Sequence, residues 1–183
     1  AGDTRLVASG DYTDDGILDV VTGSTDGTSG NSLLLLHPGR GDGTFMAELV
    51  LRDRASPIER VTSADVDADG ALDVISLSLE PASGDWEIRV HRMDGMGMVQ
   101  TTLAASLTQQ PLAMCAGDVD GDRLADLIVN LRRAGTNLQQ VWKGNGDGTF
   151  LAPVETTTAD APWETLLADM NLDGIPDIVG IFG

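Results

Sequence analysis

Short apolar runs alternate with acidic or glycine-rich turns along the whole chain, and no segment shows a helical period. Four runs rich in β-branched residues begin on or beside an aspartate, and a shorter β-like segment precedes each one. Runs of this size between turn residues are typical of buried strands. We therefore predict first strands at 5–8, 60–63, 113–116 and 165–168. The predicted second strands are 18–21, 72–75, 125–129 and 176–179.

Two further strands are predicted in each of the first three repeats. The third strands are 32–37, 86–91 and 139–143, and the fourth strands are 46–51, 98–103 and 151–155. The third and fourth strands are joined by Gly-x-Gly-Asp-Gly-Thr-Phe at 39–45 and 144–150, and by Asp94-Gly95 in the second repeat. Asp-Gly between strand-like runs indicates a hairpin, because the turn requires positive φ. Four strands in a repeat of about 50 residues predict a β-propeller blade.

The predicted fold is all-β, with blades of four antiparallel strands arranged as an open or partial propeller of about three and a half blades. The blades span approximately 5–56, 57–109 and 110–160, with a half-blade at 161–183, in a single domain 1–183. An unpaired edge and open blade faces would need covering by other protein chains or by copies of this chain. The sequence is compatible with a fragment of a longer propeller and with a complete subunit.

An acidic loop joins each pair of inner strands. Oxygen-bearing side chains stand at positions 1, 3, 5 and 9 of the loop, and glycine usually stands at position 6. We name the loops loop 1 (11–19), loop 2 (65–73), loop 3 (118–126) and loop 4 (169–177); they begin 54, 53 and 51 residues apart. Hard oxygen ligands spaced by two residues suit calcium. An EF-hand is excluded because strands, not helices, flank these loops and no glutamate stands at position 12.

We predict up to four Ca²⁺ ions, each held by four side chains and the backbone carbonyl of position 7. The predicted ligands are Asp11, Thr13, Asp15, Ile17 and Asp19 in loop 1, and Asp65, Asp67, Asp69, Ala71 and Asp73 in loop 2. They are Asp118, Asp120, Asp122, Leu124 and Asp126 in loop 3, and Asp169, Asn171, Asp173, Ile175 and Asp177 in loop 4. One such loop alone could be an ordinary Asx-rich turn, but four in phase gather carboxylates that repel without a cation.

Loop 3 departs from the pattern at one position. Arg123 stands at position 6, where the other loops have glycine, and Gly121 precedes it by two residues. A bulky residue at positive φ costs on the order of 1 kcal/mol. We therefore expect Gly121 to shift the turn of loop 3.

The chain is strongly acidic, with a formal net charge of −18. Since 15 of its 29 acidic residues lie in the four loops, bound cations would neutralise much of this charge. The charge argues against nucleic acid and against an anionic membrane surface as partners. No apolar run approaches the ~18 residues of a membrane-spanning helix, so no membrane insertion is expected. Because the chain starts at Ala1, we expect either that a leader has been removed or that this is a piece of a longer chain. Calcium sites with Kd of roughly 10⁻⁴ to 10⁻³ M suit a secreted or cell-surface location.

The four loops and the two Gly-Asp-Gly-Thr-Phe turns resemble the FG-GAP/VCBS calcium-loop repeats of integrin-α-type β-propellers, over essentially the whole chain. This resemblance implies seven blades around an axis, calcium between first and second strands, and a role in recognition or adhesion. We expect a non-catalytic, calcium-stabilised module for protein interaction, adhesion or assembly, and glycans are further candidate partners. The alternatives are a lectin-like propeller and an accessory segment of a secreted polysaccharide-degrading enzyme.

Other chemistry in the chain is interpreted as structural. Arg40-Gly41-Asp42 spells an adhesion tripeptide, but the aspartate belongs to the repeated turn. His37 and His91 are expected to be packing or surface residues and not a catalytic pair, and Cys115 a core residue. No Ser/His/Asp order and no phosphate-binding loop occurs, so we expect no enzyme. Core or inter-blade packing is predicted for three residues, with a sugar-stacking surface as the alternative: Trp86, Trp142 and Trp163.

Overall fold

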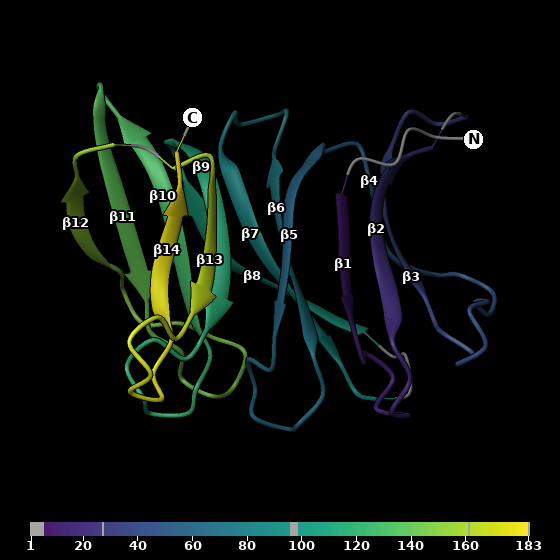
Figure 1. The fold of residues 1–183 in the computed structure, drawn as a ribbon. Coiled ribbons are helices and arrows are strands. Elements are labelled where there is room, and N and C mark those ends of the chain that lie inside the picture. Colours follow the sequence, from purple (N-terminus) through teal and green to yellow (C-terminus); the bar gives the residue numbers. More distant parts are fainter. Residues whose placement is uncertain (1–5, 27, 96–98, 161, 183) are drawn as a thin grey trace. The chain divides into compact units, whose positions relative to one another are not determined.

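A computed structural model describes residues 6–26, 28–95, 99–160 and 162–182, and every regular element in them is a strand (Figure 1). Three sheets have four antiparallel strands in chain order, and a fourth sheet has two. This confirms the predicted fold class of four-stranded blades with one half-blade. The predicted boundaries at Arg5, Met98, Ala161 and Gly183 lie outside the described residues. A single domain over 1–183 stays a prediction.

The strands have the following bounds. The first sheet contains β1 (Leu6–Gly10), β2 (Asp19–Thr25), β3 (Ser32–His37) and β4 (Leu49–Arg54). The second contains β5 (Ile58–Ala64), β6 (Asp73–Leu79), β7 (Trp86–Met93) and β8 (Val99–Leu107). The third contains β9 (Gln110–Gly117), β10 (Asp126–Arg133), β11 (Thr136–Trp142) and β12 (Val154–Thr158), and the last pairs β13 (Glu164–Ala168) with β14 (Asp177–Ile181).

The inner strands form where the apolar runs predict them. Each second strand begins on the position-9 aspartate of its loop, and the first six residues of both β6 and β10 are buried. A strand buried on both faces needs a continuous apolar run, and β-branched side chains suit its pleated surface. The short acidic loops are therefore hairpin connections between inner strands, as predicted.

The fourth strands begin later than predicted, and this corrects the sequence analysis. β4 starts at Leu49 and not at Met46, and β12 starts at Val154 and not at Leu151. The turn itself uses the intervening residues. Met46 N donates to Pro38 O at 2.7 Å, and Leu151 N donates to Lys143 O at 2.8 Å, before the strand ladder begins.

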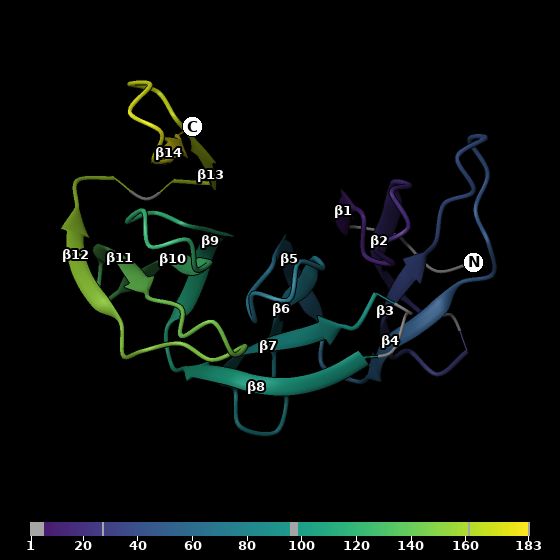
Figure 2. The ribbon, with the colours of Figure 1, turned by 90° about the horizontal axis from the view of Figure 1, so that it is seen from below.

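The chain divides into two compact units, which we describe separately: unit 1 comprises Ala1–Ser63 and Gly70–Ser106, and unit 2 comprises Ala64–Asp69 and Leu107–Gly183. In unit 1 (Figure 2), the first two sheets contribute side chains to one apolar core. Its buried members are Tyr12, Val21, Leu34, Leu36, Leu51, Val74 and Met93. Tyr12 also donates its hydroxyl to Ser63 Oγ at 3.0 Å.

Within unit 2, β13 packs beside β9 (Figure 2). A Cβ on Gly117 would lie 2.7 Å from Leu167 Cδ1, so a larger residue there would require the leucine side chain to shift. Asn130 Nδ2 donates to Thr165 Oγ1 at 2.7 Å, which links β10 to β13 inside a buried environment. Cys115 on β9 is buried, and burial raises the pKa of its thiol to about 12. This confirms Cys115 as a core residue.

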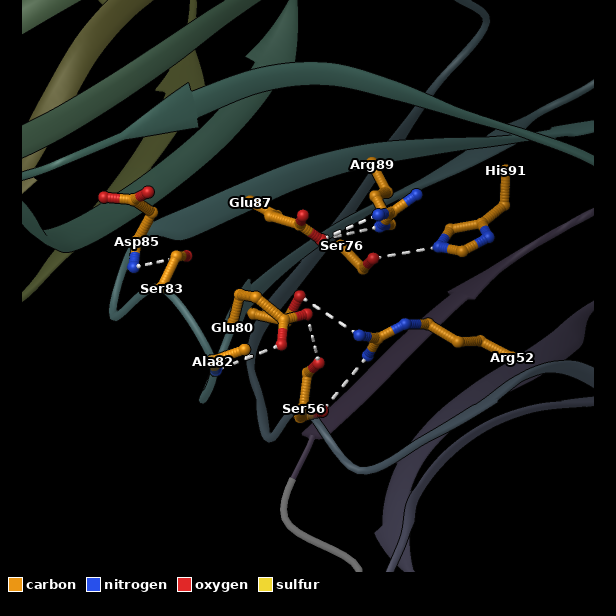
Figure 3. Close-up of polar contacts among 11 residues, drawn as sticks. Arg52, Ser56, Ser76, Glu80, Ala82, Ser83, Asp85, Glu87, Arg89 and His91 are labelled. Carbon is orange, nitrogen blue, oxygen red and sulfur yellow. Dashed lines mark hydrogen bonds and ion pairs between the residues drawn. The ribbon is translucent and has the colours of Figure 1, made fainter.

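A buried arginine links the two sheets of unit 1 (Figure 3). Arg52 on β4 is 5% exposed and donates to Ser56 O and to Ser78 Oγ, both at 3.3 Å. Ser56 Oγ in turn donates to Glu80 Oε2 at 3.1 Å. Burial lowers the pKa of Arg52. These hydrogen bonds make the otherwise apolar contact between the two sheets specific, because a buried guanidinium requires correctly placed acceptors.

His91 is a second buried polar group of unit 1 and is completely inaccessible to solvent. Its Nε2 lies 2.8 Å from Ser76 Oγ (Figure 3), and its Nδ1 lies 2.9 Å from Thr101 Oγ1. Burial, followed by the positive charges of Arg52 and Arg89, lowers the pKa of His91 to about 3. His91 therefore bridges three strands as a neutral ring, which confirms that it is a packing residue.

The depressed pKa of His91 makes stability depend on pH. The unfolded chain takes up a proton near pH 6.5, whereas folded His91 does so only near pH 3, so stability is lost as pH falls through this window. Between pH 6.5 and 5 we expect the wild type to lose about 1.5 kcal/mol more unfolding free energy than His91→Gln. Urea denaturation at each pH measures this. His37→Gln is the matched control, because His37 is partly exposed; equal pH slopes for wild type and His91→Gln would refute the prediction.

Candidate metal centres

The four acidic loops are closed by the strand ladders on either side of them. Gly10 pairs with Asp19, Gly117 with Asp126, and Ala168 with Asp177 in antiparallel register. The residue before position 1 therefore faces position 9 across the hairpin. This register fixes the position-9 carboxylate at the base of each of these loops.

All four loops share one backbone pattern, in which positions 4 and 6 both have positive φ. The pairs are Asp14 (53°) and Gly16 (79°), Ala68 (59°) and Gly70 (97°), Gly121 (83°) and Arg123 (72°), and Leu172 (64°) and Gly174 (89°). Loop 3 thus exchanges the glycine between the two positions while its conformation is kept. The expected shift of its turn is wrong: Arg123 adopts the glycine conformation, at a cost on the order of 1 kcal/mol.

Packing explains why loop 3 has its glycine at position 4. A Cβ on Gly121 would lie 3.1 Å from Cδ1 of Ile175, which is position 7 of loop 4 in the same unit. That distance is shorter than ordinary van der Waals contact. The neighbouring loop therefore favours glycine at this position, and the strained φ falls on Arg123.

The position-1 carboxylate holds loops 1, 3 and 4 in shape through backbone N–H groups. Asp118 Oδ1 accepts from Gly121 N at 2.7 Å, and its Oδ2 accepts from Arg123 N at 2.8 Å. Asp11 accepts from Gly16 N at 2.8 Å, and Asp169 accepts from Gly174 N at 2.9 Å. The loops are therefore built locally by their own side chains, as Asx turns are.

The position-9 aspartate connects its loop to the end of the neighbouring third strand of the same sheet. Asp126 Oδ2 accepts from Val119 N at 3.1 Å in loop 3, and Oδ1 accepts from Gly144 N at 3.0 Å, just beyond β11. The other two four-stranded sheets repeat the second bond: Gly39 N donates to Asp19 Oδ1 and Met93 N to Asp73 Oδ1, both at 2.8 Å. All three carboxylates are completely inaccessible to solvent. Burial raises the pKa of Asp126.

Two loops bring three carboxylates together at metal-binding distances. One oxygen from each of Asp65, Asp67 and Asp73 lies within 4.8 Å of the others, and the same holds for Asp118, Asp120 and Asp126. In loop 2 the Oδ1 atoms of Asp65 and Asp67 are also buried. Three such charges at this separation repel strongly, and a bound cation reverses that repulsion. The oxygen donors at positions 1, 3 and 9 thus fit a hard divalent ion.

Other predicted ligands are not brought together in this way. Asp69 and Asp122, at position 5, are not members of the two groups, and among the described residues loops 1 and 4 form no group of three acidic side chains. In loop 1, Thr13 replaces the second carboxylate and donates its hydroxyl to Asp19 Oδ2 at 3.1 Å. In loop 4, Asn171 Oδ1 accepts from Asp173 N at 2.8 Å. Coordination by these side chains and by the position-7 carbonyls stays a prediction.

Loop 3 carries a cation of its own that the sequence analysis missed. Lys143, which follows β11, donates from Nζ to Asp120 Oδ2. This bond lowers the pKa of Asp120 and raises the pKa of Lys143. Lys143 is 23 positions away from Asp120 along the chain, so no local motif indicates the contact.

The first three loops lie within a stretch of the chain that matches a known repeat family. The FG-GAP-like repeat family matches residues 11–76 and 65–129, which include the first three loops. The chain belongs to the FG-GAP-like repeat family. This confirms the resemblance predicted from the aspartate loops.

The fold is similar to that of a solved enzyme structure. Rhamnogalacturonan lyase PL11 from Bacillus licheniformis matches with a TM-score of 0.62 and 16% sequence identity. The match covers 99% of this chain and 40% of the lyase chain, so the chain spans less than half the length of that protein. A search of curated protein sequences finds no match.

The turns of the FG-GAP-like repeats show why the Gly-x-Gly-Asp-Gly-Thr-Phe pattern recurs. Asp42 Oδ1 accepts from Thr44 N at 2.9 Å, and Asp147 Oδ1 accepts from Thr149 N at 3.0 Å. Asp42 therefore belongs to the turn, as the sequence analysis proposed for the Arg-Gly-Asp tripeptide. Within unit 2, Gly148 N also donates to Val66 O in loop 2 at 2.9 Å, so this turn contacts a candidate metal loop.

A pocket and the exposure of the tryptophan side chains are relevant to which classes of ligand the surface could bind. A pocket of about 480 Å³ in unit 1 is lined by Thr13, Asp15, Pro38, Met46, Ala47, Leu49 and Gly95, without an aromatic side chain. Trp163 is 74% exposed, so the predicted core or inter-blade packing does not hold for it in the described part of unit 2. Trp86 and Trp142 are partly buried.

The described residues contain no helix long and apolar enough to cross a bilayer.

The position-9 carboxylate accepts backbone hydrogen bonds and is also a candidate metal ligand. Mutation can separate these two roles. In Asp126→Asn, the new NH₂ group faces one of the two backbone N–H donors, so a buried hydrogen bond is lost. We expect the unfolding free energy in chelator to fall by about 2 kcal/mol. Asp122→Asn is the control, since this exposed residue can keep its bond from Leu124 N; its loss should be below about 0.5 kcal/mol. Equal losses in urea denaturation would contradict a metal-independent role for Asp126.

Proposed function

We propose that the chain is a non-catalytic, calcium-stabilised module for protein interaction, adhesion or assembly, in a secreted or cell-surface protein. The observation that carries this proposal is the pair of carboxylate triads at loops 2 and 3 of the FG-GAP-like repeats. They lie where the first and second strands of a sheet meet, so an ion bound there would fix strand pairing.

Calcium is the cation that suits these loops best. All the candidate donors are oxygens, and flexible loops with several carboxylates match the six to eight ligands that calcium accepts. Magnesium prefers a near-ideal octahedron and keeps most of its waters. A chain with a net charge of −18 also gains from neutralising its densest acidic clusters.

Interaction with other protein chains is supported by apolar side chains that the described residues leave exposed. In unit 2 they include Trp163 at 74%, Val154 at 63% and Phe182 at 58% exposed. In unit 1 they include Val7 at 67% and Val50 at 60%. Further protein chains, or copies of this chain, would cover these side chains.

A second candidate function is a segment of a secreted protein that degrades polysaccharides. The similarity to part of the rhamnogalacturonan lyase over 99% of this chain favours it. In this case the chain supplies a scaffold, and catalytic residues lie elsewhere in the protein. The exposed indole of Trp163 would be the first place to look for sugar stacking.

Calcium should stabilise the folded chain measurably. With Kd values of roughly 10⁻⁴ to 10⁻³ M, 2 mM calcium contributes about 0.7 to 1.8 kcal/mol per occupied site. For a chain of this size we expect Tm to rise by at least about 5 °C between chelator and 2 mM CaCl₂. Magnesium at the same concentration should raise Tm by less. A Tm that is the same in chelator and in calcium would remove the proposal.

Carbohydrate binding separates the two candidate functions. For an interaction module we expect no retention on a glycan array and no cleavage of rhamnogalacturonan in calcium. Binding that disappears in Trp163→Ala, and persists in Leu172→Ala, would instead support the polysaccharide-associated function. Leu172 is a suitable control because it is another strongly exposed apolar residue, at 88%. Cleavage by the chain itself would contradict both candidates.

A further inference from the structure

Lys143 is placed next to loop 3 by the backbone and not by chance contact. The adjacent residue, Gly144, donates its N–H to Asp126 Oδ1 at 3.0 Å, which fixes this part of the chain at the base of the loop. A Cβ on Gly144 would collide with the carbonyl oxygen of Ala125, so the approach is as close as a backbone allows. From there the lysine side chain reaches Asp120.

The acceptor of this ion pair is itself one of the candidate metal ligands. Asp120 is position 3 of loop 3 and a member of the triad with Asp118 and Asp126. An ammonium group on Asp120 neutralises part of the triad and occupies an oxygen that a calcium ion would use. The ammonium and the metal ion therefore compete for the same charge.

The equivalent positions in the other two four-stranded sheets differ. The residues before the N–H donors Gly39 and Met93 are Pro38 and Arg92. Proline has no charge to offer, and Arg92 donates from Nη2 to Gln100 Oε1 on β8. The residue at this position is thus different in each of the three sheets.

We propose that Lys143 is an internal counter-ion of loop 3, which supports the loop without metal and weakens its affinity for calcium. This inference rests on the proposed calcium role. When calcium enters, Lys143 must leave Asp120, so the lost ion pair is subtracted from the free energy of calcium binding. Loop 3 should accordingly fill at higher calcium concentrations with Lys143 in place than without it, which would make it one of the weaker sites of the chain.

The test compares calcium binding and metal-free stability in one set of variants. Lys143→Met removes the charge and keeps the aliphatic length, whereas Lys143→Arg keeps the charge. Arg133→Met is the matched control, because it removes one positive charge from an exposed ion pair with Glu155 in the same sheet, away from any loop. Calorimetric titration with CaCl₂ gives the affinities, and melting in chelator gives the stability of the metal-free protein.

For Lys143→Met we expect the weaker sites to gain about fivefold in calcium affinity at low salt, and less than about twofold at 0.5 M NaCl. In chelator the same variant should melt at a lower temperature than the wild type. Lys143→Arg and Arg133→Met should keep wild-type affinity. In an Asp120→Asn background, Lys143→Met should change the affinity little, because the pair is already broken.

Opposite signs in calcium and in chelator are the signature of a competing counter-ion. Unchanged or weaker calcium affinity in Lys143→Met would overturn the inference, and so would an equal gain in Arg133→Met. A persistent gain in the Asp120→Asn background would also overturn it. Failure of every variant to bind calcium would instead overturn the proposed function itself.

Discussion

The buried position-9 carboxylate is the interaction on which each four-stranded sheet depends. One of its oxygens accepts a backbone N–H from the last residue of the third strand or from just beyond it, at 2.8 to 3.0 Å in all three sheets. In loops 1 and 3 the other oxygen accepts the N–H of position 2. A single side chain thus ties the hairpin of the inner strands to the outer half of the sheet. A buried carboxylate with such partners is costly to replace, because its donors would lose their acceptors.

This carboxylate also explains how folding and metal binding are joined. The aspartates that hold the backbone at positions 1 and 9 of loop 3, and at position 9 of loop 2, are members of the acidic triads. Their backbone bonds arrange the oxygens before any ion arrives, which reduces the ordering cost of binding. The remaining cost is charge repulsion, since the loops hold about half of the acidic residues of the chain. An ion removes that repulsion, and in loop 3 Lys143 removes part of it.

The packing between sheets inside unit 1 differs from the packing inside unit 2, although the sheets have the same plan. In unit 1 an apolar cluster is accompanied by the buried Arg52 network and by the neutral ring of His91. In unit 2, glycine at position 117 admits Leu167, and Asn130 bonds Thr165 across the strands. The repeats of this chain therefore keep the loop conformation constant, whereas the packing between sheets depends on side chains specific to each contact.

The sequence by itself determined the all-β class, the positions of the inner strands and the family, because hydrophobic period and aspartate spacing are local properties of the chain. It also indicated which side chains form the acidic loops. The tertiary structure decided which atoms lie next to those side chains. The partner of Asp126 Oδ1 is 18 residues away, and the partner of Asp120 is 23 residues away.

The same reason accounts for the errors of the sequence analysis. The late start of β4 follows from how the turn closes on Pro38, and the exchanged glycine of loop 3 follows from Ile175 in the neighbouring loop. Spacing along the chain says which groups can be close, whereas only packing determines which long-range neighbours they meet.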